Sequence, residues 1–384
     1  MAVQLLTPYQ ADRMLLAYNN NIVRFKSNTV GTPLNATITG FGFVAVLYPH
    51  PNGEFYFNFK EYIIAELNKY NFADMNLGID LTAGDYQKSV DDGYCKSDNI
   101  EIKIKFVNPA TPEDVNYFAY TFILGVEQLT DRFSETFSTN NLFNMLTPLQ
   151  ENGKAYIKYW KGLPFEVSTF SSLNYTPPTG LNPIDFYILG SINIALNGGV
   201  SNATVQVPNT GRTNALWFSD GLNNLIPFDC DFIYSTVLNA TIEQIKNNCG
   251  TYVKFRNKYG RWNYWLFESG KYETRSTKSI GELLNDFKDV RETNAPLIQL
   301  GRTADSTIKV QADKLDYRNK LILEQIIDSP KIYLFTGKPN HIAKETDWLE
   351  IALKTNSFVV ENPKKKLYKY TIEFDIPNRY TQTL

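Results

Sequence analysis

The sequence has few of the residues that perform catalysis and bind metal ions. Its 384 residues include only two histidines and three cysteines, and no cysteine belongs to a CxxC pair. Histidine is the usual general base at neutral pH and the commonest metal ligand. The phosphate-binding and nucleophile motifs GxxxxGK[ST], GxGxxG and GxSxG are also missing. We therefore expect no enzyme activity, no cofactor and no metal ion.

The remaining candidates for chemistry are weak. His50 stands in a YPHPN turn and His341 in a KPNHI loop, which is typical of surface turn residues. The acidic group at 91–92 lacks the spacing of a calcium loop. The possible carboxylate cluster at 229–231 stands in the apolar segment IPFDCDFIY, which is more typical of the start of a strand. Two carboxylates that hydrolyse a glycosidic bond need only to meet in space, so a hydrolase of cell-wall or capsular polymer stays open as a minor alternative.

Charge and hydrophobicity exclude further classes of protein. The formal net charge is −2, and proteins that hold nucleic acid by its phosphates usually carry a basic excess. No run approaches 18 apolar residues, and the N-terminus has no basic segment followed by an apolar one. An odd number of scattered cysteines is typical of a reducing cytoplasm. We expect no membrane span, no signal peptide, no sequence-specific nucleic acid, and assembly in a cytoplasm.

Aromatic and apolar residues are plentiful. The chain is 43% hydrophobic, 20% charged and 14% aromatic, which is the composition of a folded globular protein rich in strands. Length and turn-rich stretches predict three domains, at 1–150, 151–240 and 241–384. The expected fold class is mainly β with a few short helices (α+β), built from β-sandwich or barrel-like domains.

A hairpin is expected in the first domain. The apolar run Gly40–Tyr48 predicts a strand buried on both faces. His50–Glu54 then supplies Pro and Asn-Gly, which favour a tight reversal. Phe55–Phe59 follows as the partner strand.

Periodicity predicts the other elements. In the first domain, the strands are Asn21–Ser27 and Asn99–Val107, and the helix is Lys60–Tyr70. In the second, the strands are Tyr156–Trp160, Phe165–Phe170, Phe186–Ala195 and Thr204–Val207. In the third, Tyr252–Arg256 and Asn263–Phe267 form a hairpin that turns at Gly260, the helices are Ser279–Val290 and Tyr317–Asp328, and the strands are Lys331–Phe335, Trp348–Lys354 and Leu367–Ile376.

The most aromatic segment is YGRWNYWLF, at 259–267. In a strand, Trp262 and Tyr264 point to one face and Trp265 to the other. Exposed, these rings would form a stacking platform for sugars or bases. Buried, one set fills the core and the other packs against a helix or a neighbouring subunit, and we favour this interpretation. With Trp348, these three residues are our candidate interaction residues.

The C-terminal third resembles a known group of proteins. The segments CGTYVKFRNKYGRWNYWLFE (249–268), SPKIYLF (329–335), DWLEIALK (347–354) and KKLYKYTIEFDIP (365–377) resemble structural proteins of tailed phages and prophages of Bacteroidota. The segment NGEFYFNFKEYI (52–63) is similar to the opening of the same group. These are distal-tail, baseplate or neck-type proteins whose β-rich domains assemble into a ring. The resemblance covers about half the chain and implies no catalytic residues.

The resemblance implies a virion protein located in the tail region. Its expected partners are identical copies in a homo-oligomeric ring and other tail, neck or baseplate proteins. We expect the contacts at strand edges and loops, first at Gly40–Phe59 and Gly337–Asp347, because unpaired backbone groups lie there. A carbohydrate-binding module that recognises the host is the alternative.

Overall fold

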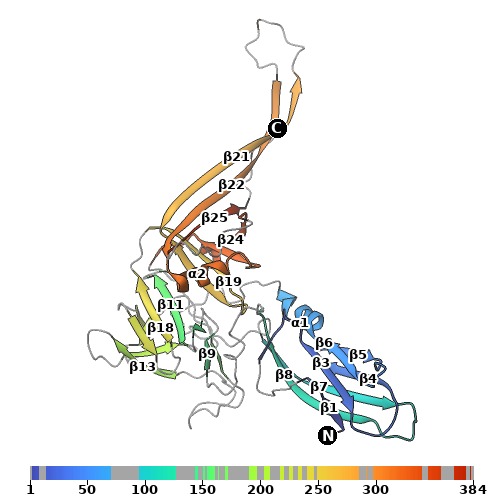
Figure 1. The fold of residues 1–384 in the computed structure, drawn as a ribbon. Coiled ribbons are helices and arrows are strands. Elements are labelled where there is room, and N and C mark those ends of the chain that lie inside the picture. Colours follow the sequence, from blue (N-terminus) through green and yellow to red (C-terminus); the bar gives the residue numbers. More distant parts are fainter. Residues whose placement is uncertain are drawn as a thin grey trace. The chain divides into compact units, whose positions relative to one another are not determined.

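The computed structural model consists mainly of β-strands, with a few short helices (Figure 1). It describes residues 2–7, 14–70, 95–126, 143–145, 150–151, 154–160, 163, 169–171, 190–196, 203–207, 217–219, 225–227, 232–235, 240–245, 249–284, 291, 297–339, 345–355, 367–377 and 381. The chain forms two compact units, and the second comprises Asn248–Phe255, Tyr264–Gly337 and Thr346–Leu384. The fold is β-sandwich-like, as the sequence predicts.

The N-terminal part of the first unit is a sandwich of two sheets. A three-stranded sheet has the order β1-β3-β6, and a five-stranded sheet has the order β2-β8-β7-β4-β5. The strands are β1 (Val3–Leu5), β2 (Met14–Leu16), β3 (Ile22–Ser27), β4 (Pro33–Gly40), β5 (Phe43–Leu47), β6 (Phe55–Asn58), β7 (Cys95–Phe106) and β8 (Asp114–Ile123). The predicted strands at 21–27 and 99–107 are confirmed as β3 and β7.

The predicted hairpin of 40–59 is wrong. β5 pairs with β4 in the five-stranded sheet, whereas β6 pairs with β3 in the three-stranded sheet. The expected reversal does form, since Gly53 N–H donates to the His50 carbonyl and His50 N–H to the Glu54 carbonyl, both at 2.8 Å. It turns the chain from one layer of the sandwich into the other.

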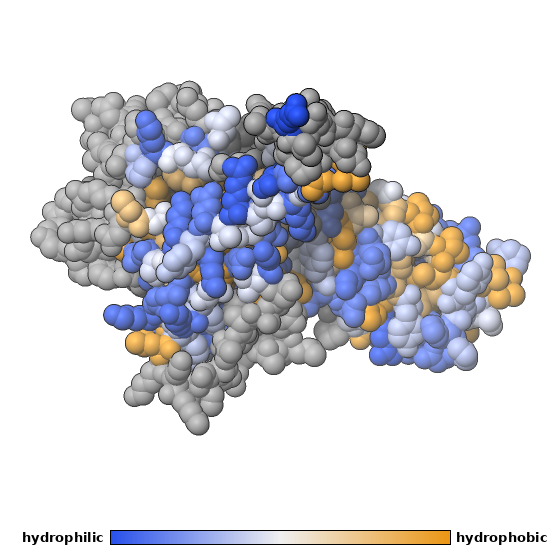
Figure 2. Space-filling model, turned by 90° about the horizontal axis from the view of Figure 1, so that it is seen from above, coloured by the Kyte–Doolittle hydropathy of each residue, from blue (hydrophilic) through white to orange (hydrophobic). Residues whose placement is uncertain are grey.

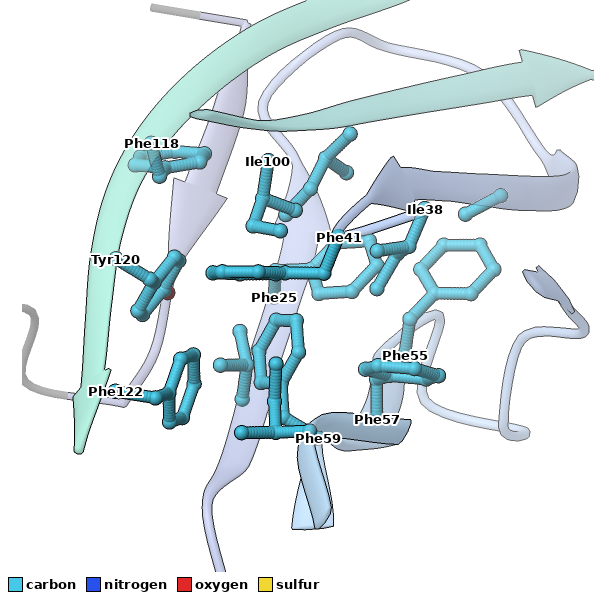
Figure 3. Packing of buried hydrophobic residues seen from close by; sticks show 14 of the residues in the cluster. Phe25, Ile38, Phe41, Phe55, Phe57, Phe59, Ile100, Phe118, Tyr120 and Phe122 are labelled. Atoms are coloured by element: carbon cyan, nitrogen blue, oxygen red, sulfur yellow. The ribbon is translucent and has the colours of Figure 1, made fainter. Parts of the chain in front are cut away.

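Aromatic rings fill the space between the two sheets (Figure 3). Phe25 stacks on Phe55 with ring centroids 5.2 Å apart, and Phe59 lies 5.2 Å from Tyr120 and 5.6 Å from Phe122. Alternation along β3, β6 and β8 points the strand residues inward, and Phe59 joins them from the start of α1. Aromatic side chains therefore form a large part of this core.

The turn between β4 and β5 has an unusual residue. Phe41 and Gly42 have φ of +46° and +76°, the left-handed region that a two-residue hairpin turn requires. A bulky side chain is rare there. Phe41 is held by burial of its ring, which lies 5.4 Å from Phe122, and by its N–H, which donates to Asp98 Oδ2 at 2.7 Å.

The predicted helix of residues 60–70 is confirmed as α1 (Lys60–Leu67) and the 3₁₀ turn η1 (Asn68–Tyr70). Ile63 and Leu67, one turn apart, are buried against the sandwich core. Asn58 Oδ1 accepts the Lys60 N–H at 3.1 Å and so satisfies one of the free donors at the start of the helix.

The remainder of the first unit contains an eight-stranded sheet of order β10-β11-β18-β17-β13-β14-β15-β16. A two-stranded sheet pairs β9 with β12. The strands are β9 (Phe143–Met145), β10 (Gln150–Glu151), β11 (Lys154–Trp160), β12 (Thr169–Ser171), β13 (Gly190–Leu196), β14 (Ala203–Val207), β15 (Trp217–Ser219), β16 (Leu225–Pro227), β17 (Phe232–Ser235) and β18 (Ala240–Ile245). Of the four predicted strands here, 165–170 lies largely outside the described residues, and the others correspond to β11, β13 and β14. The division into three domains stays a prediction.

A seven-stranded sheet of order β20-β19-β23-β24-β25-β22-β21 contains the rest of the strands. Its strands are β19 (Thr251–Arg256), β20 (Trp262–Phe267), β21 (Ser269–Leu284), β22 (Leu297–Leu315), β23 (Ile332–Phe335), β24 (Trp348–Leu353) and β25 (Tyr368–Ile376). A 3₁₀ turn, η4 (Glu345–Asp347), precedes β24. The predicted hairpin β19–β20 and the strands β23, β24 and β25 are confirmed.

The helix predicted at 279–290 is wrong, as far as the structure describes it. Ser279–Leu284 belongs to β21, which pairs antiparallel with β22. The spacing of Ile280, Leu283 and Leu284 is that of a helix face, but cross-strand pairing with Leu297–Arg302 overrides it. The sequence did not predict β22.

The second predicted helix is confirmed as α2 (Tyr317–Glu324), which ends four residues earlier than the predicted Asp328. Asp316 caps its N-terminus by accepting the Asn319 N–H at 2.8 Å. On this helix, Glu324 lies 3.2 Å from Lys320 Nζ and accepts the Tyr370 hydroxyl at 3.0 Å. Burial raises the pKa of the Glu324 carboxyl above its usual value, and the Lys320 ammonium opposes that rise.

We expect the substitution Glu324→Gln to reduce the pH dependence of stability. The pKa of Glu324 is higher in the folded chain than in the unfolded one, so the folded state binds more protons and stability falls as pH rises above about 4.5. Urea titrations between pH 4 and 8 measure this slope. Tyr370→Phe removes a donor to the carboxylate and should steepen it, so equal slopes in all three proteins would contradict the assignment.

Candidate interaction surfaces

The four aromatic residues singled out from the sequence are buried. Trp262 is 0% exposed, Trp265 4%, and Tyr264 and Trp348 8% each. Every residue of β20 is buried, so the side chains on both faces of this strand, and not on one face alone, are packed inside the protein. A sugar or base stacks on an exposed ring face. These rings offer none, and their role in interactions has no support from exposure and stays a prediction.

Trp348, Tyr264 and Tyr252 form one aromatic cluster with Phe335 in the second unit. Trp348 lies 5.0 Å from Phe335 and 6.2 Å from both Tyr252 and Tyr264, measured between ring centroids. The buried Lys254 ammonium lies 4.1 Å above the Trp348 ring. This cation–π contact partly offsets the cost of removing the charge from water.

The turn of the β19–β20 hairpin is organised by its own side chains. Asn257 Oδ1 accepts the N–H groups of Tyr259 and Arg261, both at 2.9 Å, and Gly260 adopts a φ of +69°. Arg256 donates to the Gly260 carbonyl at 2.8 Å, and its guanidinium carbon lies 3.9 Å from the Trp262 ring centroid. Trp262 is therefore a structural residue of this hairpin.

The other candidates for chemistry mostly fall where nothing is described. His341 and the acidic groups at 91–92 and 229–231 lie outside the described residues. His50 lies in the turn before β6, 4.5 Å from the Tyr56 ring. Among the described residues, no three histidine, cysteine, aspartate or glutamate side chains are close enough to hold a metal ion. Within the same residues, no helix has the length and hydrophobicity needed to cross a membrane.

Apolar side chains reach the surface in patches (Figure 2), and one set lies on the β21–β22 hairpin. β25 pairs with β22 only from Ser306 to Leu315, so the residues of β22 before Ser306 pair with β21 alone. This two-stranded segment projects as a long ribbon (Figure 1). We call its outer end, Ile280–Leu284 with Leu297–Gly301, the ribbon end. Its exposed apolar residues are Ile280, Leu283, Leu284, Leu297 and Ile298.

The second set lies on β5. Val44 is 66% exposed and Val46 55%, both on the outer face of the five-stranded sheet, and Tyr48, which follows the strand, is 74% exposed. The prediction of a strand buried on both faces is therefore wrong for this chain alone: Phe43, Ala45 and Leu47 pack against the core, but the opposite face is open. β5 lies within Gly40–Phe59, where the sequence predicts contacts. The other such segment, Gly337–Asp347, is described only at its ends, where Thr336 N–H donates to the Asp347 carbonyl at 2.8 Å.

Comparisons with known proteins add little to this geometry. No family model matches the chain, and a search of curated proteins found no match. A solved structure of protocadherin gamma B7 extracellular cadherin domains 1–4 aligns at 7% identity, over 80% of this chain and 72% of that one, with a TM-score of 0.17. A TM-score this low carries no argument, so the surfaces described above are the basis for a function.

Proposed function

We propose that the chain is a structural protein of a tailed-phage virion, a ring or adaptor component of the tail, neck or baseplate that assembles with identical copies and neighbouring virion proteins. The observation that carries the proposal is the ribbon end. Five exposed aliphatic side chains crowd the end of a two-stranded segment. Exposed apolar patches of this kind mark interaction sites. The phage resemblance of the C-terminal third supports the choice of a virion.

Assembly is tested first by the mass of the purified full chain. We expect multiples of 43.9 kDa by native mass spectrometry and by light scattering. A chain that stays monomeric across micromolar concentrations, with and without its neighbours from the same virion, would overturn the proposal. Antibody labelling of purified particles then locates the chain, and its absence from particles would overturn the virion assignment.

A paired substitution tests the ribbon end itself. Leu284 lies opposite Leu297 in the antiparallel register, so Leu284→Glu with Leu297→Lys keeps the two strands attracted while it removes two of the five exposed apolar side chains, both from one face of the ribbon. We expect this variant to fold and to fail in assembly. Thr274→Glu with Thr307→Lys, another directly opposed pair in the same hairpin, is the matched control and should assemble normally. If the two variants assembled equally well, Leu284 and Leu297 of the ribbon end would not be part of the assembly contact.

A further inference from the structure

β5 has no charged residue, proline or bulge to protect its edge of the sheet. It is the outermost strand of the five-stranded sheet, and no described strand pairs with its far side. Its register with β4 is regular from Ala36–Leu47 to Gly40–Phe43, so it has no bulge. From Gly40 to Tyr48 the sequence GFGFVAVLY has no charged residue and no proline. Natural edge strands usually carry one of these features because an open edge pairs with other chains.

The edge strand β21 shows the contrast. It lies at the margin of the seven-stranded sheet, and it carries the exposed residues Lys271, Glu273, Arg275 and Lys278. Charges at an open edge discourage pairing with another strand. β5 lacks them and exposes Val44 and Val46 instead, which suits a strand that has a partner.

The sequence of β5 is close to a palindrome in residue size and type. In either direction, the strand has a large residue (Phe43 or Leu47), then Val, Ala45, Val and a second large residue. We propose that β5 pairs antiparallel with β5 of a second copy of this chain, about a two-fold axis through Ala45. Val44 then lies opposite the partner's Val46, and Phe43 opposite the partner's Leu47. The two five-stranded sheets join into one continuous sheet.

Both faces of the joined sheet gain apolar contacts. On the inner face, Phe43 stacks on Phe57 at 5.5 Å and lies 4.6 Å from Tyr62, so the core extends to this edge and continues into the partner. On the outer face, Tyr48 lies opposite the partner's Gly42. A Cβ added at Gly42 would meet nothing within 4 Å, so there is open space for the ring. Directly opposed apolar pairs are the unit of sheet stabilisation.

The two-fold axis identifies the second copy as the occupant. A strand from another protein would need the same order of large and small residues, and β5 supplies this order to itself. Such a contact uses the same patch on both copies and closes on itself. Only β5 is needed to form it, so the pairing is expected whether or not the chain is a virion protein.

Charge exchange at positions 44 and 46 tests both the contact and its register. Val44→Lys with Val46→Lys places like charges opposite each other across the axis, as does Val44→Glu with Val46→Glu. Like charges at an interface cost several kcal/mol, so we expect the dissociation constant of each variant to rise at least about 100-fold. A mixture of the Lys and Glu variants should form heterodimers whose dissociation constant lies within about tenfold of that of the native pair. Sedimentation velocity of the full chains measures all three.

The matched control is Thr37→Lys with Thr39→Lys. These residues lie opposite Val46 and Val44 on β4, so the same charges sit one strand inside the edge. This variant should pair like the native chain. The proposal would be overturned if the Lys and Glu variants each still formed the dimer that the native chain forms, or if their mixture formed no heterodimer.

A second measurement needs no variant. Amide hydrogen exchange of the native chain should slow in Phe43–Leu47 as concentration rises, because pairing occupies the outward N–H groups. Exchange that is independent of concentration, in a chain that is monomeric throughout, would refute the β5 pair even if the charged variants fail to fold.

Discussion

Replacing Phe59 by alanine should lower the free energy of unfolding of the N-terminal sandwich by about 3–5 kcal/mol. The Phe59 ring is completely buried and lies 4.9 Å from Phe57, 5.2 Å from Tyr120 and 5.6 Å from Phe122. These neighbours come from both sheets, so none can move into the cavity without leaving its own strand. The loss should be near the upper end of the range for that reason.

Hydrogen exchange measures this loss in the full chain, in peptides from β7 and β8. Protection should fall by about 1,000-fold, the equivalent of about 4 kcal/mol. The control is Tyr62→Ala, which removes a partly exposed ring 5.4 Å from Phe57 on the adjoining helix and should cost much less. Similar losses in the two variants would mean that Phe59 is not the centre of this core.

Trp262→Ala should destabilise the β19–β20 hairpin by about 3–5 kcal/mol. The substitution removes a fully buried ring and leaves the Arg256 guanidinium, 3.9 Å from its centroid, without the aromatic face that helps to hold it. Peptides covering Thr251–Phe267 should lose hydrogen-exchange protection. Tyr272→Ala, at an exposed position on β21, should change the protection little.

The same variant separates the two interpretations of the aromatic segment. If Trp262 is structural, assembly and glycan binding change only as far as the fold is lost. A variant as stable as the native chain that no longer binds a partner or a glycan would restore the interaction role predicted from the sequence.

Most elements that local periodicity predicts are present in the structure, although the sequence analysis missed several strands, β4 and β8 among them. Strict alternation in Asn99–Val107 fits only a strand, and the amphipathic spacing in Lys60–Tyr70 fits only a helix. The structure has β7 and α1 at these places. The wrong predictions fall where a segment could form two different structures and the strand that it pairs with decides between them. The run Gly40–Phe59 has the residues of a hairpin, but β3 and β4 supply the partners of β6 and β5. The spacing of Ile280, Leu283 and Leu284 fits a helix as well as a strand, and the register with β22 decides it.

The sequence predicted where the candidate surface on β5 lies, but it did not predict that one face of this strand is exposed. Gly40–Phe59 was expected to hold contacts, and β5 lies within it. Its apolar run was interpreted as buried on both faces, yet Val44 and Val46 are open in the single chain. Alternation cannot distinguish a strand covered by its own fold from one covered by a partner, because both require apolar residues on two faces. The burial of Trp262 and Trp265 agrees with the interpretation that we favoured from the sequence, although the sequence could not show what covers each face of the strand.

The order of strands in the sandwich has a consequence for synthesis of the protein. β7 lies between β4 and β8 in the five-stranded sheet, yet it follows β4, β5 and β6 in the chain. A ribosome adds about 5–20 residues per second. The second edge of β4 therefore stays without its partner strand on the order of seconds, while the chain from Tyr70 to Phe106 is made, before β7 can pair with it. During that interval the nascent chain is most exposed to aggregation, and chaperone binding to this segment would have its greatest effect.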